Sequence, residues 1–185
     1  MTEFDSQTLG LADGRRIVLR CARESDAAAL LEHFKLLFLD GEGMIGEPDE
    51  GTQSEDELRV WIKTHLDGPR SLLLIVDFEG MIVGSLDFNT AKRRRCAHWG
   101  AFAMGVSPGW RGCGIGNALL TCLLEWAVSI PEIEKVTLAV RADNHRAIAL
   151  YKKHGFVQSG YLKDYLKMQD GKYVDDLTME IFVRS

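Results

Sequence analysis

The sequence predicts an α/β domain in which helices are layered against a mixed β-sheet. Strand-length apolar segments recur along the chain, and segments with apolar residues at helical intervals lie between them. Strands dominate, and two pairs of them flank hairpin turn signals, so the expected sheet is mixed and mostly antiparallel. The length of 185 residues suits one domain with a substantial core, and we expect a single domain over residues 1–185.

The first third of the chain is predicted to form a strand, two helices and the loop between them. After a polar lead-in, residues 16–20 form the strand, and Ser25 or Asp26 caps a helix that continues to about Phe34. Residues 40–52, with four glycines and a proline, form the loop.

A capping box predicts where the second helix begins. Ser54 and Glu57 have the spacing at which each side chain can bond the backbone N–H of the other. Apolar residues then follow at helical intervals, namely Leu58, Trp61, Ile62 and Leu66.

The centre of the chain is predicted to form a hairpin and a further strand. Residues 71–78 and 81–88 are rich in Leu, Ile and Val, and the Glu-Gly pair between them can form the turn. The basic residues 92–95 form a loop, and the apolar residues 98–106 form the next strand.

The final third is predicted to alternate helices with strands. A glycine-rich turn leads into a helix that ends before Pro131, because proline cannot continue a helix. Residues 136–140 form a strand, and residues 144–154 form a helix that a left-handed glycine ends. Residues 156–168 and 172–183 flank an Asp-Gly pair, which is a strong hairpin signal.

Composition and charge argue against several classes of protein. Hydrophobic residues make up 46% of the chain and charged residues 26%, ordinary values for a globular protein. The net charge is −5 and the pI about 5.6, so no overall basic field favours nucleic acid or an anionic membrane. The longest compact apolar run, residues 72–76, is far shorter than a bilayer span, and the polar, acidic start argues against a secretory signal.

The cysteines show neither metal-ligand nor disulfide spacing. Cys21, Cys96, Cys113 and Cys122 are scattered, with no CxxC pair and no Cys/His pattern. We therefore expect no metal, no disulfide framework and a reducing, cytoplasmic location.

The most informative segment is the glycine-rich turn of residues 106–116, which follows a strand and opens a helix. Glycines allow positive φ angles and let a ligand approach the backbone closely. Free N–H groups at a helix N-terminus form a cradle for phosphate oxygens, and Arg111 could add charge-assisted contacts. The spacing of Gly112, Gly114 and Gly116 is neither the dinucleotide GxGxxG nor a P-loop, because no Lys-Ser or Lys-Thr follows. On its own, such a turn often does no more than end a strand and begin a helix.

A second segment, residues 144–156, begins just after a predicted strand. Asn144 and Tyr151 lie about two helical turns apart, so their side chains can face the same side. Taken alone, Asn144 is a helix cap and Tyr151 a half-buried aromatic residue whose hydroxyl reaches the surface.

Together the two segments resemble the GNAT superfamily of N-acetyltransferases. Residues 111–116 match its Arg/Gln-x-x-Gly-x-Gly/Ala pyrophosphate signature, and residues 144–156 match its second signature. Residues 80–84 are similar to the family's central hairpin, and the resemblance covers about residues 15–183. The pattern of residues 170–179 looks like members that acetylate amino acids, polyamines or protein N-termini.

The resemblance implies a V-shaped split between strands 98–106 and 136–140, with helices on both faces, and acetyl-CoA as co-substrate. Main-chain groups near Met104 and Val106 are expected to pair with the pantetheine arm, and an N–H near Met104 to polarise the thioester carbonyl. The N–H groups of residues 112–116 are expected to hold the pyrophosphate. The implied cofactor-binding residues are Met104, Val106, Arg111, Gly112, Cys113, Gly114, Ile115, Gly116 and Asn144.

The resemblance assigns Tyr151 as the general acid that protonates the departing thiolate. A phenol with a reference pKa near 10 keeps its proton at neutral pH, so it can donate it. The implied reaction is direct attack by a primary amine, on a small molecule or a peptide N-terminus, in a ternary complex. No cysteine is placed to suggest a covalent intermediate, since Cys113 has no histidine near it in sequence.

The sequence leaves the general base open. Many family members carry a Glu on the strand before the pyrophosphate turn, but residues 98–106 contain no carboxylate. His98 lies at the far end of that strand, about 26 Å from its last residue. Asp87, on the neighbouring strand, could act through a water chain, and Asp164 and Asp175 are further candidates on the acceptor side. A water chain with no dedicated base is equally open.

Charged segments bear on partners. Glu42, Glu47, Asp49 and Glu50 lie in the loop before the second helix and would attract a cationic acceptor, although a solvated loop explains them equally well. Residues 92–95 fit a solvated tip, with an acidic partner as the alternative.

Two further questions stay open at this stage. The alternative to an enzyme is a non-catalytic acyl-CoA sensor or binding subunit that kept the phosphate cradle, and O-acetylation or a longer acyl donor is also compatible with that cradle. The oligomeric state is not determined by the sequence, although a homodimer is common among similar proteins.

Overall fold

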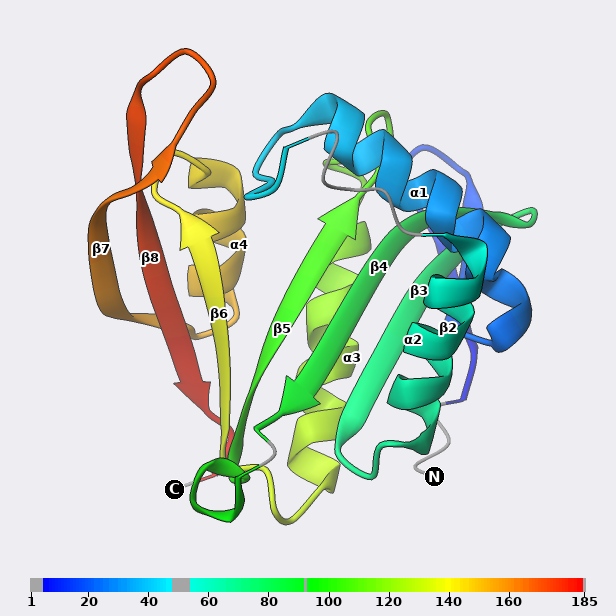
Figure 1. Cartoon of the computed structure of the whole chain (residues 1–185). Coiled ribbons are helices and arrows are strands. Elements are labelled where there is room, and N and C mark those ends of the chain that lie inside the picture. The colour runs from blue at the N-terminus through cyan, green and yellow to red at the C-terminus, as the bar shows by residue number, and fades with distance from the viewer. Residues whose placement is uncertain (1–4, 48–53, 92, 185) are drawn as a thin grey trace.

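Residues 5–47, 54–91 and 93–184 are described by the computed structural model, and in them one eight-stranded sheet is combined with four α-helices (Figure 1). The strands are β1 Gln7–Gly10, β2 Arg16–Cys21, β3 Ser71–Phe78, β4 Met81–Thr90, β5 Trp99–Val106, β6 Lys135–Arg141, β7 Val157–Lys167 and β8 Tyr173–Phe182. The helices are α1 Ala27–Asp40, α2 Glu55–Asp67, α3 Ile115–Ser129 and α4 His145–Lys153. The strand order is β1-β2-β3-β4-β5-β6-β8-β7, and among these described strands only β5 and β6 are parallel neighbours. The expected mixed, mostly antiparallel α/β fold is confirmed.

β5 and β6 are paired only where they begin. Residues 99–101 pair with residues 135–137, after which β5 continues to Val106 and β6 to Arg141 without pairing to each other. Each strand remains paired on its outer side, β5 with β4 and β6 with β8. Figure 1 shows the two halves of the sheet diverging like the arms of a V. The expected split is therefore present.

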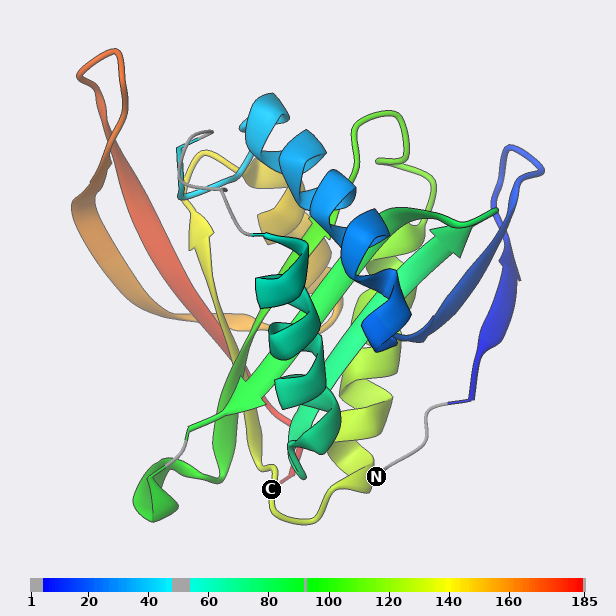
Figure 2. The same ribbon diagram turned by 45° about the vertical axis from the view of Figure 1, so that its right-hand side comes forward.

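Helices cover both faces of the sheet (Figure 2). On one face, α1 and α2 bury residues such as Leu30 against Ile75 of β3. On the other face, α3 buries Leu119 and Trp126 against the sheet, and α4 covers β6 on the same side. Because its central strands are covered on both faces, the sheet contains the continuous apolar run of residues 72–76, all of which are buried.

Several cap and turn predictions are confirmed. The Ser54 hydroxyl accepts from the N–H of Glu57 at 3.3 Å, and the Glu57 carboxylate accepts from the N–H of Ser54 at 2.7 Å, so the capping box is complete. Gly155 ends the helical segment of α4 with a φ of +89°. In the two predicted hairpins, Gly80 and Gly171 have φ angles of +88° and +81°, which glycine adopts without strain.

Two expectations near the N-terminus were wrong. Part of the polar lead-in forms β1, which pairs antiparallel with β2; as an edge strand it is mostly exposed and carries no apolar alternation. The first helix does not end near Phe34 but continues to Asp40, and Gly41 ends it with a φ of +66°. Residues 36–39 are all apolar, so they show no helical period by which sequence could extend the helix.

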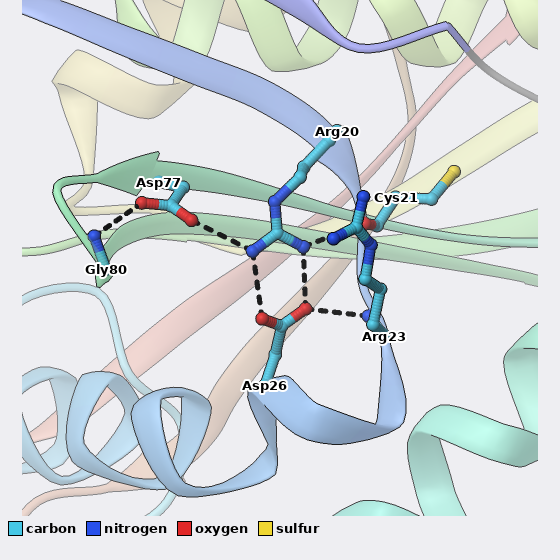
Figure 3. A network of polar contacts seen from close by, with 6 residues as sticks. All are labelled: Arg20, Cys21, Arg23, Asp26, Asp77 and Gly80. Carbon is cyan, nitrogen blue, oxygen red and sulfur yellow. Dashed lines mark hydrogen bonds and ion pairs between the residues drawn. The ribbon is translucent and has the colours of Figure 1, made fainter.

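Asp26 occupies the N-cap position of α1, one of the two predicted, but its side chain makes no capping hydrogen bond in the described structure, because the carboxylate is used elsewhere. Arg20 of β2 donates to both Asp26 oxygens, at 2.7 and 2.9 Å, and to Asp77 of β3 at 2.9 Å (Figure 3). Asp77 also accepts from the N–H of Gly80 in the hairpin turn. This network fastens the start of α1 to two strands of the sheet.

Candidate active site

The inner edges of the split present unpaired main-chain groups. In an antiparallel pair, alternate residues bond to the same neighbour. Ser107 donates its N–H to the Val83 carbonyl of β4, and the Gly100 carbonyl accepts from the Thr137 hydroxyl of β6. By this alternation the main-chain groups of the even-numbered residues Phe102, Met104 and Val106 face the split. The geometry agrees with the expected role of Met104 and Val106.

A cavity of about 610 Å³ occupies the split and continues to the glycine-rich turn. Its walls come from β5, β6, the turn before α3 and the inner side of α4. Of the residues predicted to bind the cofactor, it is lined by Met104, Val106, Arg111, Gly112, Gly114, Gly116 and Asn144. Cys113 and Ile115 are outside the lining: the Cys113 thiol contacts Arg15 and Asp13, and Ile115 is buried in the core.

The glycine-rich turn ends in a row of backbone donors without internal acceptors. Gly112 and Gly114 have φ angles of +78° and +97°. The first N–H bonded within α3 is that of Ala118, to the Gly114 carbonyl, and among the described residues the N–H groups of 111–117 have no backbone acceptor. A Cβ added at Gly112 or Gly114 would meet nothing within 4 Å, so these positions border open space. The arrangement suits the oxygens of a pyrophosphate.

Arg111 is held by acidic residues at the end of α1. Its guanidinium contacts Asp40 and Glu42, each at 2.6 Å, and its Nε donates to the Val106 carbonyl at 2.9 Å. Hydrogen bonding to Arg111 lowers the pKa of Asp40. Arg111 therefore closes one end of the cavity by joining the turn to α1, and a phosphate would compete with these carboxylates for it.

Tyr151 of α4 lines the same cavity with a side chain that is 6% exposed. Its ring packs edge-on against Phe102 and Phe156, with centroids 5.8 and 6.0 Å away. Within the described ranges its hydroxyl has no hydrogen-bond partner. Burial raises the pKa of Tyr151 to about 12, so the phenol keeps its proton at neutral pH.

Asn144 lies at the start of α4 and borders the cavity. Its side-chain oxygen accepts from the N–H of Ala147 at 3.1 Å. Asn144 is therefore a helix cap, the role predicted for it when it is considered without the family resemblance. Its side-chain nitrogen lies 2.5 Å from where a Cβ on Gly43 would be. Only a glycine therefore lets the loop after α1 approach the start of α4 this closely.

A second cavity of about 380 Å³ lies on the face covered by α1 and α2. It shares Met104 and its two neighbours on β5 with the first cavity, so the two cavities meet there. Asp87 of β4 lines it and is the cross-strand neighbour of Ala103. Burial raises the pKa of Asp87, while the nearby His65 acts in the opposite direction. Asp87 of β4 is therefore directly opposite the residue that precedes Met104 on β5.

Comparison with known proteins agrees with this geometry. The chain matches the model of the acetyltransferase (GNAT) family over residues 30–156, well over half of its length. The chain belongs to the GNAT family. The L-amino acid N-acetyltransferase AaaT of Escherichia coli K12 is 31% identical over 116 residues, which are 63% of this chain and 71% of that protein.

Solved structures show the same fold. A GNAT-family acetyltransferase from Streptococcus pneumoniae superposes with a TM-score of 0.86 at 24% identity, over 90% of this chain and 99% of that one. A putative acetyltransferase from Salmonella typhimurium, solved with its cofactor acetyl-CoA, has a TM-score of 0.80 at 18% identity, over 91% of this chain and 95% of that one.

In this GNAT protein, sequence reasoning missed a buried histidine beside the site. His33 of α1 is 1% exposed; its Nδ1 lies 2.8 Å from the Ser107 hydroxyl and its Nε2 lies 3.0 Å from the Ser85 hydroxyl. It therefore connects α1 to β4 and to the start of the glycine-rich turn. Burial lowers its pKa to about 4. The available signal was its spacing from Leu30 and Leu37, which places it on the buried side of α1.

We expect His33 to make folding depend on pH. Its folded-state pKa of about 4 lies below the ordinary 6.5, so between these values the unfolded chain binds more protons. Its contribution to the free energy of unfolding is therefore complete above pH 6.5 and falls by about 3 kcal/mol (2.5 pH units at 1.36 each) as pH drops to 4. Asp87, whose pKa is raised, opposes part of this fall.

Urea unfolding of the wild type and of His33→Gln, measured from pH 7 to pH 4, isolates this contribution. The difference between their unfolding free energies should shrink as pH falls. His98→Gln, at an exposed strand-end histidine, is the matched control and should leave the wild-type dependence intact. Parallel curves for the wild type and His33→Gln would contradict the assignment.

Other residues singled out from the sequence lie outside both cavities of this GNAT chain. The Asp175 carboxylate accepts from the Tyr161 hydroxyl and the Asp164 N–H, so it stabilises an irregular part of the β7–β8 hairpin. Glu47 accepts from Gln169 at 2.6 Å, and Asp49 and Glu50 lie outside the described residues.

Of the basic loop, Lys92 is also outside the described residues, and the rest lies at the closed end of the split, remote from the glycine-rich turn. No helix in the described ranges is both long and apolar enough to cross a membrane. The same ranges hold no group of three or more His, Cys, Asp or Glu side chains placed to bind a metal ion.

Proposed function

We propose that this chain, as one domain over residues 1–185, transfers an acetyl group from acetyl-CoA to a primary amine by direct attack in a ternary complex. The observation that carries the proposal is the meeting of two cavities at Met104. One cavity ends in free backbone amides and contains Tyr151; the other contains Asp87. A donor in the first and an amine in the second would meet across β5.

The residues of the split fit acetyl-CoA. The main-chain groups of Met104 and the N–H of Val106 can bond an extended amide-bearing arm as a neighbouring strand would, whereas the Val106 carbonyl already accepts from Arg111. The N–H groups that follow Gly112 offer donors for two linked phosphates. Acetyl-CoA supplies the activated thioester; the protein binds and orients it.

The chemistry requires one new bond, one broken bond and two proton movements. The amine nitrogen bonds to the thioester carbon while the carbon–sulfur bond breaks, and the N–H of Met104 stabilises charge on the carbonyl oxygen. Tyr151 gives its proton to the departing thiolate. The proton lost by the amine passes through water to Asp87, whose raised pKa makes its carboxylate a better proton acceptor than an exposed one.

Thiol release tests the proposal directly. Purified protein is mixed with acetyl-CoA and a panel of primary amines, and free thiol is followed while mass spectrometry detects the acetylated amine. We expect thiol release that depends on both protein and amine, with one thiol for each acetylated product. Binding of coenzyme A with no amine-dependent release across the panel would overturn the proposal in favour of a non-catalytic acyl-CoA-binding subunit.

A further inference from the structure

We propose that the acetyl acceptor is a primary amine with one ammonium group, an apolar body of aromatic size and no carboxylate. This inference rests on the proposed function and assigns the second cavity as the acceptor site. It follows from which side chains form that cavity and which charges are present in it.

The walls of the acceptor cavity are mostly apolar and include the aromatic rings of Phe34, Phe38 and Trp61. Phe34 of α1 and Trp61 of α2 form an edge-to-face pair with ring centroids 6.0 Å apart, and Met44 closes one side. The remaining apolar lining is Leu31, Leu37, Ala103, Met104 and Gly105. A volume of about 380 Å³ is at the small end of the range of ligand pockets, which suits one ring with a short chain.

Gly105 also helps to set the shape of the cavity. A Cβ there would lie 2.3 Å from a methyl carbon of Leu37, so any other residue would displace the Leu37 side chain from its present place in the cavity wall. The residue opposite Asp87 is the small and exposed Ala103. Space is therefore left beside the carboxylate, at the place where the two cavities meet.

Asp87 is the one charged side chain in the lining among the described residues, and Ser85 is its polar neighbour on the same strand. A carboxylate there attracts a single ammonium and holds it next to Met104, where the thioester is expected. A second ammonium, as in a polyamine, would lose hydration among mostly apolar side chains, and the described lining offers it no second carboxylate.

A carboxylate on the acceptor would be poorly accommodated. None of the described residues in the lining is Lys or Arg, and the undescribed residues 48–53 contain neither in their sequence. The arginines of the neighbouring cavity are already paired: Arg111 with Asp40, Arg141 with Asp143 and Arg146 with Glu42. An α-carboxylate would lose hydration, gain no cation and be repelled by Asp87.

The effect of a carboxylate on the acceptor can be isolated with three amines that share one ring: 2-phenylethylamine, phenylalaninamide and phenylalanine. Each is assayed by acetyl-CoA-dependent thiol release, at pH values that give equal fractions of neutral amine. We expect kcat/KM for the first two to exceed that for phenylalanine by about 10²-fold or more, because an unpaired buried carboxylate is costly. Butylamine and spermidine should also be poorer than 2-phenylethylamine.

Two variants test separately the contribution of the aromatic wall and that of the Asp87 charge to acceptor choice. Trp61→Leu should lower kcat/KM for 2-phenylethylamine by about 10-fold with little effect on butylamine, since the aromatic body loses its wall. Tyr165→Leu, at an exposed tyrosine of β7, is the matched control. Asp87→Asn should narrow the gap between phenylalaninamide and phenylalanine, because it removes the repulsion, whatever its effect on absolute rates.

The outcomes distinguish this inference from the proposed function. Acetylation of phenylalanine or spermidine at least as fast as 2-phenylethylamine would overturn the inference and leave acetyl transfer standing. An unchanged discrimination in both Trp61→Leu and Asp87→Asn would overturn the assignment of the cavity. Acetylation of no amine would overturn both.

Discussion

Replacing Tyr151 by phenylalanine is expected to lower kcat for acetyl transfer by roughly 10²-fold or more, the usual scale for loss of a general acid. The substitution removes one oxygen from a ring held between Phe102 and Phe156, so packing should change little. The phenol pKa of about 12 means that the wild-type side chain carries its proton at every pH at which the assay is practical. The departing thiolate would otherwise have to take its proton from water.

The measurement is single-turnover acetylation with saturating acetyl-CoA, so that chemistry and not product release limits the rate. Affinity for acetyl-CoA, determined separately, should stay within a few-fold of the wild-type value. Tyr165→Phe, at an exposed position on β7, is the matched control and should leave the rate unchanged. A wild-type rate in Tyr151→Phe under these conditions would remove Tyr151 as the acid.

Replacing Gly114 by aspartate is expected to weaken coenzyme A binding by about 10²-fold or more. Two effects act together. The φ of +97° at Gly114 is strained for any residue with a Cβ, which costs about 1–3 kcal/mol or shifts the turn. The new carboxylate would also lie beside the amides proposed to hold the pyrophosphate and would repel its charge.

Gly171→Asp is the matched control for this variant. Gly171 has a φ of +81° in the β7–β8 hairpin, and a Cβ there also meets nothing within 4 Å. The control therefore introduces comparable strain and the same charge away from the cavity. Isothermal titration with coenzyme A should give wild-type affinity for Gly171→Asp and strongly reduced affinity for Gly114→Asp. Equal affinities in the two variants would show that the turn does not bind the phosphates.

The parts of the site that lie close together in the sequence were predictable from it. The glycine-rich turn is one continuous segment, and its strand-turn-helix context follows from the apolar pattern on either side. Asn144 and Tyr151 belong to one short helix. The split in the sheet and the placement of Met104 followed from the family resemblance, because the divergence of two strands leaves no mark in their own patterns.

The parts that depend on packing between distant elements were not predictable. The acceptor cavity needs Phe34 and Trp61 from two helices and Asp87 from a strand, and no local pattern states how these elements cross. Of the carboxylates that contact Arg111, Asp40 is the last residue of α1, whose extent was itself underestimated, and Glu42 lies just after the helix. The helical spacing of His33 indicates a buried position, but its contacts with Ser85 and Ser107 depend on how α1 packs against distant parts of the chain.

Calorimetric titration of the folded wild-type protein with coenzyme A and with acetyl-CoA tests the central claim most directly. The free amides after Gly112 and the open main-chain edge of β5 predict saturable binding of both compounds at one site per chain. Neither should bind Gly114→Asp with comparable strength. A folded wild-type protein that produces no binding heat with either compound, at any temperature tried, would contradict the account.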